Sequence, residues 1–116
     1  GIYAGLRLLE ILSRTNKSLS ELLSDIPKYY STPEIKFPSP DNKKFDVIKM
    51  VKEFCEMQKW SLNTIDGVRA NFKTGWALVR ASNTGPNITM RCEATDEAGL
   101  KNLETIFTNL INTYNK

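Results

Sequence analysis

The fold of this chain is decided by residues 68–94, whose sequence is VRANFKTGWALVRASNTGPNITMRCEA. Apolar and polar side chains alternate through most of this stretch, and Thr74-Gly75 supplies a turn inside it. Alternation places successive side chains on opposite faces of a strand, which is typical of half-buried antiparallel sheets. The sequence therefore predicts strands over residues 68–72, 76–80 and 88–94.

Apolar residues with helical spacing flank these strands. Residues 43–58 carry one apolar stripe, and a last helix is predicted from an N-cap at Thr95-Asp96 to about Tyr114. The alternating segment 34–37 predicts a strand, which the prolines that bracket it make either short or an edge strand. Helices that pack on one face of an antiparallel sheet define an α+β domain. We therefore expect an α+β fold with an antiparallel sheet of about four strands and helices on one face.

The first residues also have helical spacing, but with a wider apolar surface. Ile2, Leu6 and Leu9 form one stripe, and Leu8 and Ile11 widen it. Such a helix is typical of a segment that is buried in a larger body. An ordinary N-terminal helix is the alternative interpretation.

The composition limits the chemistry that the chain offers. It has 116 residues, of which 41% are hydrophobic and 25% charged, as in one small globular domain. There is no histidine, and the two cysteines, Cys55 and Cys92, form no CxxC pair. The usual zinc ligand sets and histidine-dependent catalysis are therefore excluded. We expect buried, reduced thiols, no catalytic residue and no metal site in this chain.

Charge and hydropathy bear on partners and location. The net charge of +3 is a mild excess, whereas nucleic-acid-binding domains usually cluster basic residues densely. A small anionic ligand fits this charge equally well. No apolar run reaches the roughly 20 residues that a membrane span needs. We therefore expect a cytoplasmic location, with neither a membrane nor a nucleic-acid partner.

One segment between two predicted strands has the composition of an anion site. Arg80 offers a planar fork for bidentate contact with a phosphate, and the Ser82 and Thr84 hydroxyls donate to anionic oxygens. Asn83 donates through its amide and tolerates left-handed backbone angles, which Gly85 adopts more easily still. Such angles let successive N–H groups converge on an anion.

The residues alone leave alternatives open. Polar loops of this kind are ordinary turn chemistry, in which case Arg80 pairs with a carboxylate. Arg91 is on the polar side of the next strand, where it either reaches the same anion or pairs with a neighbouring carboxylate. We interpret Asp66-Gly67 as a turn rather than a metal site, and the tryptophans as packing residues. We interpret the lysines of the 43–58 helix, Lys43, Lys44, Lys49 and Lys52, as a solvated face.

At this loop the chain resembles a known family. The resemblance rests on Asp66–Arg69, Gly75–Pro86 and Met90–Ala94, on the opening segment Gly1–Ser13, and on Ser31–Ile35. Together these are similar, in order and over essentially the whole chain, to the C-terminal region of the α-D-phosphohexomutases. The similarity is greatest to the phosphomannomutase/phosphoglucomutase branch.

The resemblance implies a fold, a division of the chain and a role. It implies a TATA-binding-protein-like C-terminal domain over residues 28–116, preceded over residues 1–27 by the helical tail of the third domain and a linker. It implies four domains in the whole enzyme, with a phosphoserine in the first and Mg²⁺ in the second. The fourth domain holds the phosphate that is not transferred and closes the cleft.

The resemblance also implies ligands and a substrate. Arg80, Ser82, Asn83 and Thr84 would bind the substrate phosphate, with Gly85 and Arg91 as further candidates. Asn83 and Gly85 favour mannose or glucose 1- and 6-phosphates, with a 1,6-bisphosphate intermediate. The phosphoserine loop, the metal loop and the sugar-selecting loop have no counterpart here, so this chain alone is expected to be inactive. Asn87 is more polar than the residue usual at its position.

Two other functions remain as rival hypotheses. A basic sheet face with Arg69, Lys73 and Arg91 would bind nucleic acid or protein without an enzymatic role, and it would need exposed aromatic rings on the sheet. A purely structural interaction domain is the other.

Overall fold

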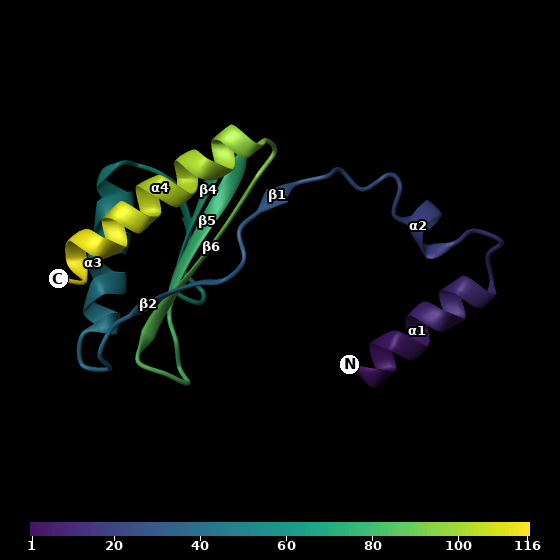
Figure 1. The fold of residues 1–116 in the computed structure, drawn as a ribbon, viewed down its shortest axis with the longest axis horizontal. Coiled ribbons are helices and arrows are strands. Elements are labelled where there is room, and N and C mark those ends of the chain that lie inside the picture. The colour runs from purple at the N-terminus through teal and green to yellow at the C-terminus, as the bar shows by residue number, and fades with distance from the viewer.

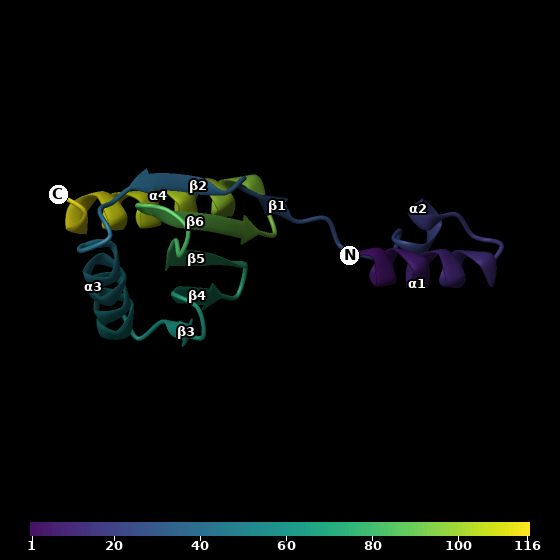
Figure 2. The ribbon, with the colours of Figure 1, turned by 90° about the horizontal axis from the view of Figure 1, so that it is seen from below.

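The computed structural model describes residues 1–116 and contains an antiparallel six-stranded sheet with two long helices on one face (Figures 1 and 2). The helices are α3 (Lys44–Met57) and α4 (Glu97–Tyr114). Strand order is β1-β6-β5-β4-β3, and β2 also pairs with β6. The α+β class and the placement of the helices are confirmed. The face of the sheet that α3 and α4 leave uncovered is called the open face below.

The three predicted central strands form a meander at the middle of the sheet. They are β4 (Val68–Phe72), β5 (Gly75–Ala81) and β6 (Asn87–Ala94). In the β5–β6 register Ala77 lies opposite Cys92 and Val79 lies opposite Met90. All four of these side chains are completely buried beneath the helices. Their polar neighbours in the sequence therefore lie on the open face, as the alternation predicts.

The sheet has six strands rather than about four, because short strands extend both of its edges. The predicted edge strand is β2 (Ile35–Pro38), which pairs with β6. Beside it β1 (Tyr30–Ser31) pairs with the end of β6, and β3 (Ser61–Asn63) pairs with β4. Strands of two or three residues are too short to show a period in the sequence, so the sequence does not predict them.

The core lies between the sheet and the two helices. Phe107 of α4 is its largest fully buried side chain, and Val47 and Val51 of α3 are buried with it. Trp60 lies 5.9 Å from Phe107 and 5.1 Å from Phe72, measured between ring centroids. Trp60 is therefore a packing residue, as predicted. The N-cap prediction for α4 is also confirmed, because Asp96 accepts a hydrogen bond from the Gly99 N–H at 2.7 Å.

The N-terminal segment lies apart from this core (Figure 1). It contains α1 (Ile2–Ser13) and the one-turn helix α2 (Leu19–Leu22), and neither helix has a buried residue. Apolar side chains of α1 are highly exposed, Ile2 by 86% and Leu9 by 62%. None of the helices combines the length and apolarity that crossing a membrane requires.

Both thiols are buried in the core and should be unreactive in the folded chain. Burial raises the pKa of Cys55 to about 11 and that of Cys92 to about 12, from an ordinary value of 9.0. Because only the thiolate is nucleophilic, we expect a thiol reagent at pH 8 to modify neither cysteine until denaturant is added. Rapid modification of a folded thiol would contradict the burial described here.

The same pKa shifts fix the sign of a pH effect. The unfolded chain loses thiol protons near pH 9, whereas the folded chain keeps them up to about 11. Stability from the buried thiols is therefore complete below pH 9 and falls as the pH rises from 9 towards 11. Denaturant midpoints measured across this range, with a Cys55→Ala variant as control, should show a smaller fall in the variant.

Candidate functional site

The predicted anion loop closes the β5–β6 hairpin over residues 82–86. The Ser82 N–H donates to the Asn87 carbonyl at 2.9 Å, and the Asn87 N–H donates to the Gly85 carbonyl at 2.9 Å. The second bond spans Pro86 and so forms a γ-turn, which suits the fixed φ of proline. Ser39 adds an outside contact, because its N–H donates to the Pro86 carbonyl at 2.9 Å.

The expected left-handed backbone at Asn83 and Gly85 is wrong. Positive φ occurs at Lys59 and Gly67 and nowhere else in the chain. The turn around Pro86 reverses the chain instead, so the loop needs no left-handed residue. Gly85 nevertheless has a close neighbour, because a Cβ there would lie 2.9 Å from Asn87 Nδ2.

The donors predicted at the loop tip are exposed or half-buried. Asn83 and Thr84 are exposed, and the Ser82 and Thr84 hydroxyl oxygens lie 3.4 Å apart. The Thr84 N–H donates to Ser82 Oγ at 3.3 Å. The N–H groups of Asn83 and Gly85 donate to no acceptor in the chain. Two N–H groups without an acceptor and two hydroxyls, one of which donates to the other, thus lie in the same loop.

A buried lysine lies beneath this loop. Lys44, in the first turn of α3, has a side chain only 6% exposed. Its ammonium donates to the Ser82 carbonyl at 2.6 Å, the Gly85 carbonyl at 3.1 Å and Asp41 Oδ1 at 2.6 Å. The prediction of a solvated lysine face is therefore wrong for Lys44. The spacing in the sequence indicates that Lys44 lies on the buried face of the helix, because position 44 precedes the buried Val47 and Val51 by three and seven residues.

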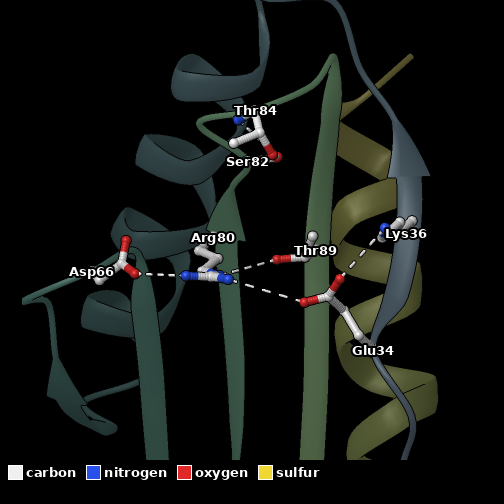
Figure 3. Close-up of polar contacts among 7 residues, drawn as sticks. All are labelled: Glu34, Lys36, Asp66, Arg80, Ser82, Thr84 and Thr89. Atoms are coloured by element: carbon white, nitrogen blue, oxygen red, sulfur yellow. Dashed lines mark hydrogen bonds and ion pairs between the residues drawn. The ribbon is translucent and has the colours of Figure 1, made fainter. Parts of the chain in front are cut away.

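Arg80 turns along the open face, away from the loop tip (Figure 3). Its guanidinium donates to Asp66 Oδ2 at 2.9 Å and to Thr89 Oγ1 at 3.3 Å, and it lies 4.0 Å from Glu34 Oε2. The structure thus pairs Arg80 with carboxylates, the alternative that the residue types left open. It does not bring the guanidinium together with the Ser82 and Thr84 hydroxyls.

Arg80 and Arg91 line one small hollow on the open face. This cavity of about 190 Å³ is also lined by Glu34, Leu78, Thr89 and Met90. Arg91 is exposed there. The structure therefore places the two arginines beside one cavity and the hydroxyls at the loop tip, as two neighbouring groups of candidate ligands.

Asp66-Gly67 forms the predicted turn at the start of β4. Gly67 has φ of 78°, and its backbone packs so tightly that a Cβ would lie 2.3 Å from the Val79 carbonyl oxygen. This close approach holds Asp66 beside Arg80. The Asp66-Gly67 pair predicts this turn from the sequence alone, whereas the contact between Asp66 and Arg80 depends on the register of β4 and β5.

The nucleic-acid hypothesis needs free aromatic rings on the open face, and the half-buried Trp76 that lies there already has an arginine on its ring. The Arg69 guanidinium lies over the Trp76 ring at 4.5 Å from its centroid, and Trp76 Nε1 donates to Glu93 at 3.3 Å. Phe72 packs instead against the core.

Comparison with known proteins identifies the family. Residues 34–110 match the family described as phosphoglucomutase/phosphomannomutase, C-terminal domain. The chain is 43% identical over 107 residues to a phosphomannomutase/phosphoglucomutase of Pseudomonas putida. This match covers 92% of this chain and 23% of the Pseudomonas putida protein. It is also 43% identical over 104 residues to a phosphoglucosamine mutase of Methanocaldococcus jannaschii. That match covers 89% of this chain and 23% of the relative.

A solved structure agrees with the sequence matches. It is a phosphoglucomutase/phosphomannomutase family protein from Burkholderia thailandensis, with a TM-score of 0.79 and 33% identity over 98% of this chain and 24% of that one. The fold is that of a mutase C-terminal domain. The chain belongs to the phosphoglucomutase/phosphomannomutase family and corresponds to its C-terminal domain. It spans about a quarter of the length of these relatives.

Proposed function

We propose that this domain binds the phosphate of a hexose phosphate that is not being transferred, as one part of a longer phosphohexomutase. The ligands are Arg80, Ser82, Asn83 and Thr84, with Gly85 and Arg91 as further candidates. The substrates are mannose or glucose 1- and 6-phosphates with a 1,6-bisphosphate intermediate. Holding one phosphate positions the sugar for transfer at its other end, which is a proximity effect.

The observation that carries this proposal is the set of hydrogen-bond donors gathered at the loop tip. The Asn83 and Gly85 N–H groups have no acceptor, and the Ser82 and Thr84 hydroxyls lie 3.4 Å apart beside them. A phosphate accepts several hydrogen bonds from such a group of donors.

Arg80 joins this set by exchanging partners. Its carboxylate partner Asp66 is 60% exposed, and the Arg80 side chain is 43% exposed. Exposed ion pairs contribute only about 0–1 kcal/mol. Releasing Asp66 therefore costs little compared with a charge-assisted bidentate bond to phosphate.

The division of the chain and the setting of the enzyme are part of the proposal. Residues 1–27 form the tail of a preceding domain and a linker, which is supported by the exposed apolar side chains of α1. Residues 28–116 form the phosphate-binding domain, which is inactive alone and closes over a cleft in the cytoplasmic enzyme. The Mg²⁺ of the longer enzyme is assigned in this proposal to residues outside this chain.

A titration with glucose 6-phosphate tests the proposal directly. Backbone amide signals of the labelled chain should shift for residues 80–87, while unphosphorylated glucose should shift none. We expect millimolar affinity, because one phosphate site captures little of a whole cleft's binding energy. Absence of shifts at these residues in millimolar ligand would contradict the proposal.

Replacing Arg80 by alanine should weaken this binding about tenfold, because a hydrogen bond to a charged group contributes about 1.5–3 kcal/mol. Arg69→Ala is the matched control, since Arg69 lies on the neighbouring strand β4 and stacks on Trp76. The control should leave glucose 6-phosphate affinity unchanged. Equal losses in both variants would favour general charge attraction, and the salt dependence of binding would then be steep.

A further inference from the structure

We propose that Lys44 is a positioning residue for the bound phosphate: it turns the Ser82 carbonyl inward and thereby presents the Asn83 N–H outward. This inference rests on the phosphate-binding function proposed above and adds a residue that does not touch the ligand. Lys44 lies on α3, far from the loop in sequence, and its ammonium is inside the domain.

The contacts of Lys44 use its whole donor capacity. An ammonium has three N–H donors, and Lys44 Nζ has three acceptors: the Ser82 and Gly85 carbonyls and Asp41 Oδ1. Lysine is almost never buried unless it is paired. Two of the three acceptors belong to the loop. If the loop moved away, the buried ammonium would lose these two hydrogen bonds, which is costly, so the loop stays in one conformation.

The geometry of the peptide unit explains how the contact between Lys44 and the Ser82 carbonyl orients the Asn83 N–H outward. The Ser82 carbonyl and the Asn83 N–H belong to the same peptide unit, which is planar and trans, so the two groups point in opposite directions. Lys44 fixes the carbonyl on the inner side at 2.6 Å. The Asn83 N–H must then face outward, and it has no acceptor within the chain.

The other end of the loop is held by the same ammonium. The Gly85 carbonyl accepts from Lys44 Nζ at 3.1 Å and from the Asn87 N–H at 2.9 Å. Both ends of the tip are thus anchored, while Asn83 and Thr84 between them stay exposed. Asp41 offsets part of the lysine's charge, so Lys44 contributes more through geometry than through long-range attraction.

The test compares two lysine variants of the whole 116-residue chain. Glucose 6-phosphate is titrated against the amide signals of Lys44→Met and Lys49→Met. We expect about tenfold weaker binding for Lys44→Met, because a preorganised donor is lost. Lys49→Met removes the same charge from an exposed position of the same helix, and its affinity should stay within about twofold of the parent.

A charge-conserving variant separates positioning from charge and also serves if Lys44→Met fails to fold. Lys44→Arg keeps the cation, but its planar fork cannot reproduce three bonds to these acceptors. We expect binding at least several-fold weaker, together with greater mobility of the residue 83–85 amides in ¹⁵N relaxation without ligand. Parent-like affinity and parent-like relaxation in a folded Lys44 variant would overturn this inference alone. Failure of the parent chain to bind would overturn the proposed function, and this inference with it.

Discussion

Replacing Phe107 by alanine is expected to lower the free energy of unfolding by about 3–5 kcal/mol. The Phe107 side chain is fully buried between α4 and the sheet, where it also packs against Trp60. Removing its ring loses buried apolar surface and leaves a cavity that neighbouring side chains fill only in part. Urea unfolding followed by tryptophan fluorescence measures the loss, because Trp60 reports on this contact.

An exposed phenylalanine provides the matched control. Phe45 of α3 is 59% exposed, so Phe45→Ala should change the free energy of unfolding by less than about 1 kcal/mol. If Phe107→Ala is largely unfolded in water, Phe107→Leu should give the same ranking with a smaller loss. A loss for Phe107→Ala no larger than for Phe45→Ala would mean that the helix-to-sheet packing described here is wrong.

Strands with one buried face could be predicted from the sequence. Residues 68–94 alternate because one face of β4, β5 and β6 lies beneath α3 and α4, so the pattern records the packing directly. The strands β1 and β3 could not be predicted, because their two or three residues are extended only through pairing with β6 and β4. Pairing with a distant partner leaves no local signal.

In the candidate site, too, some features could be predicted from the sequence and others could not. The donor residues of the loop could be found from their types and order. Their partners could not, because Lys44 is 38 residues from Ser82 and Asp66 is 14 residues from Arg80. Likewise, left-handed angles at Asn83 and Gly85 were expected on the assumption that residues within the loop reverse the chain by themselves. The observed loop uses Pro86 and a buried ammonium instead.

Gly67→Ala is expected to destabilise the domain by about 2–5 kcal/mol and to release Asp66 from Arg80. Gly67 has φ of 78°, which costs about 1–2 kcal/mol for a residue with a Cβ. The added carbon would also lie 2.3 Å from the Val79 carbonyl oxygen and 2.8 Å from Arg80 Cα. Both contacts are with backbone, so the start of β4 must move away from β5.

Gly85→Ala is the control for this substitution, measured by the same urea unfolding. Its nearest contact is Asn87 Nδ2 at 2.9 Å, the end of a side chain, and φ at Gly85 is not positive. We expect less than about 1 kcal/mol for Gly85→Ala, because the amide can rotate aside. In Gly67→Ala the Arg80 side-chain N–H signal should also shift, since the ion pair to Asp66 depends on this turn. Equal stability of the two variants would show that the close approach of Gly67 to β5 does not constrain the β5–β6 hairpin.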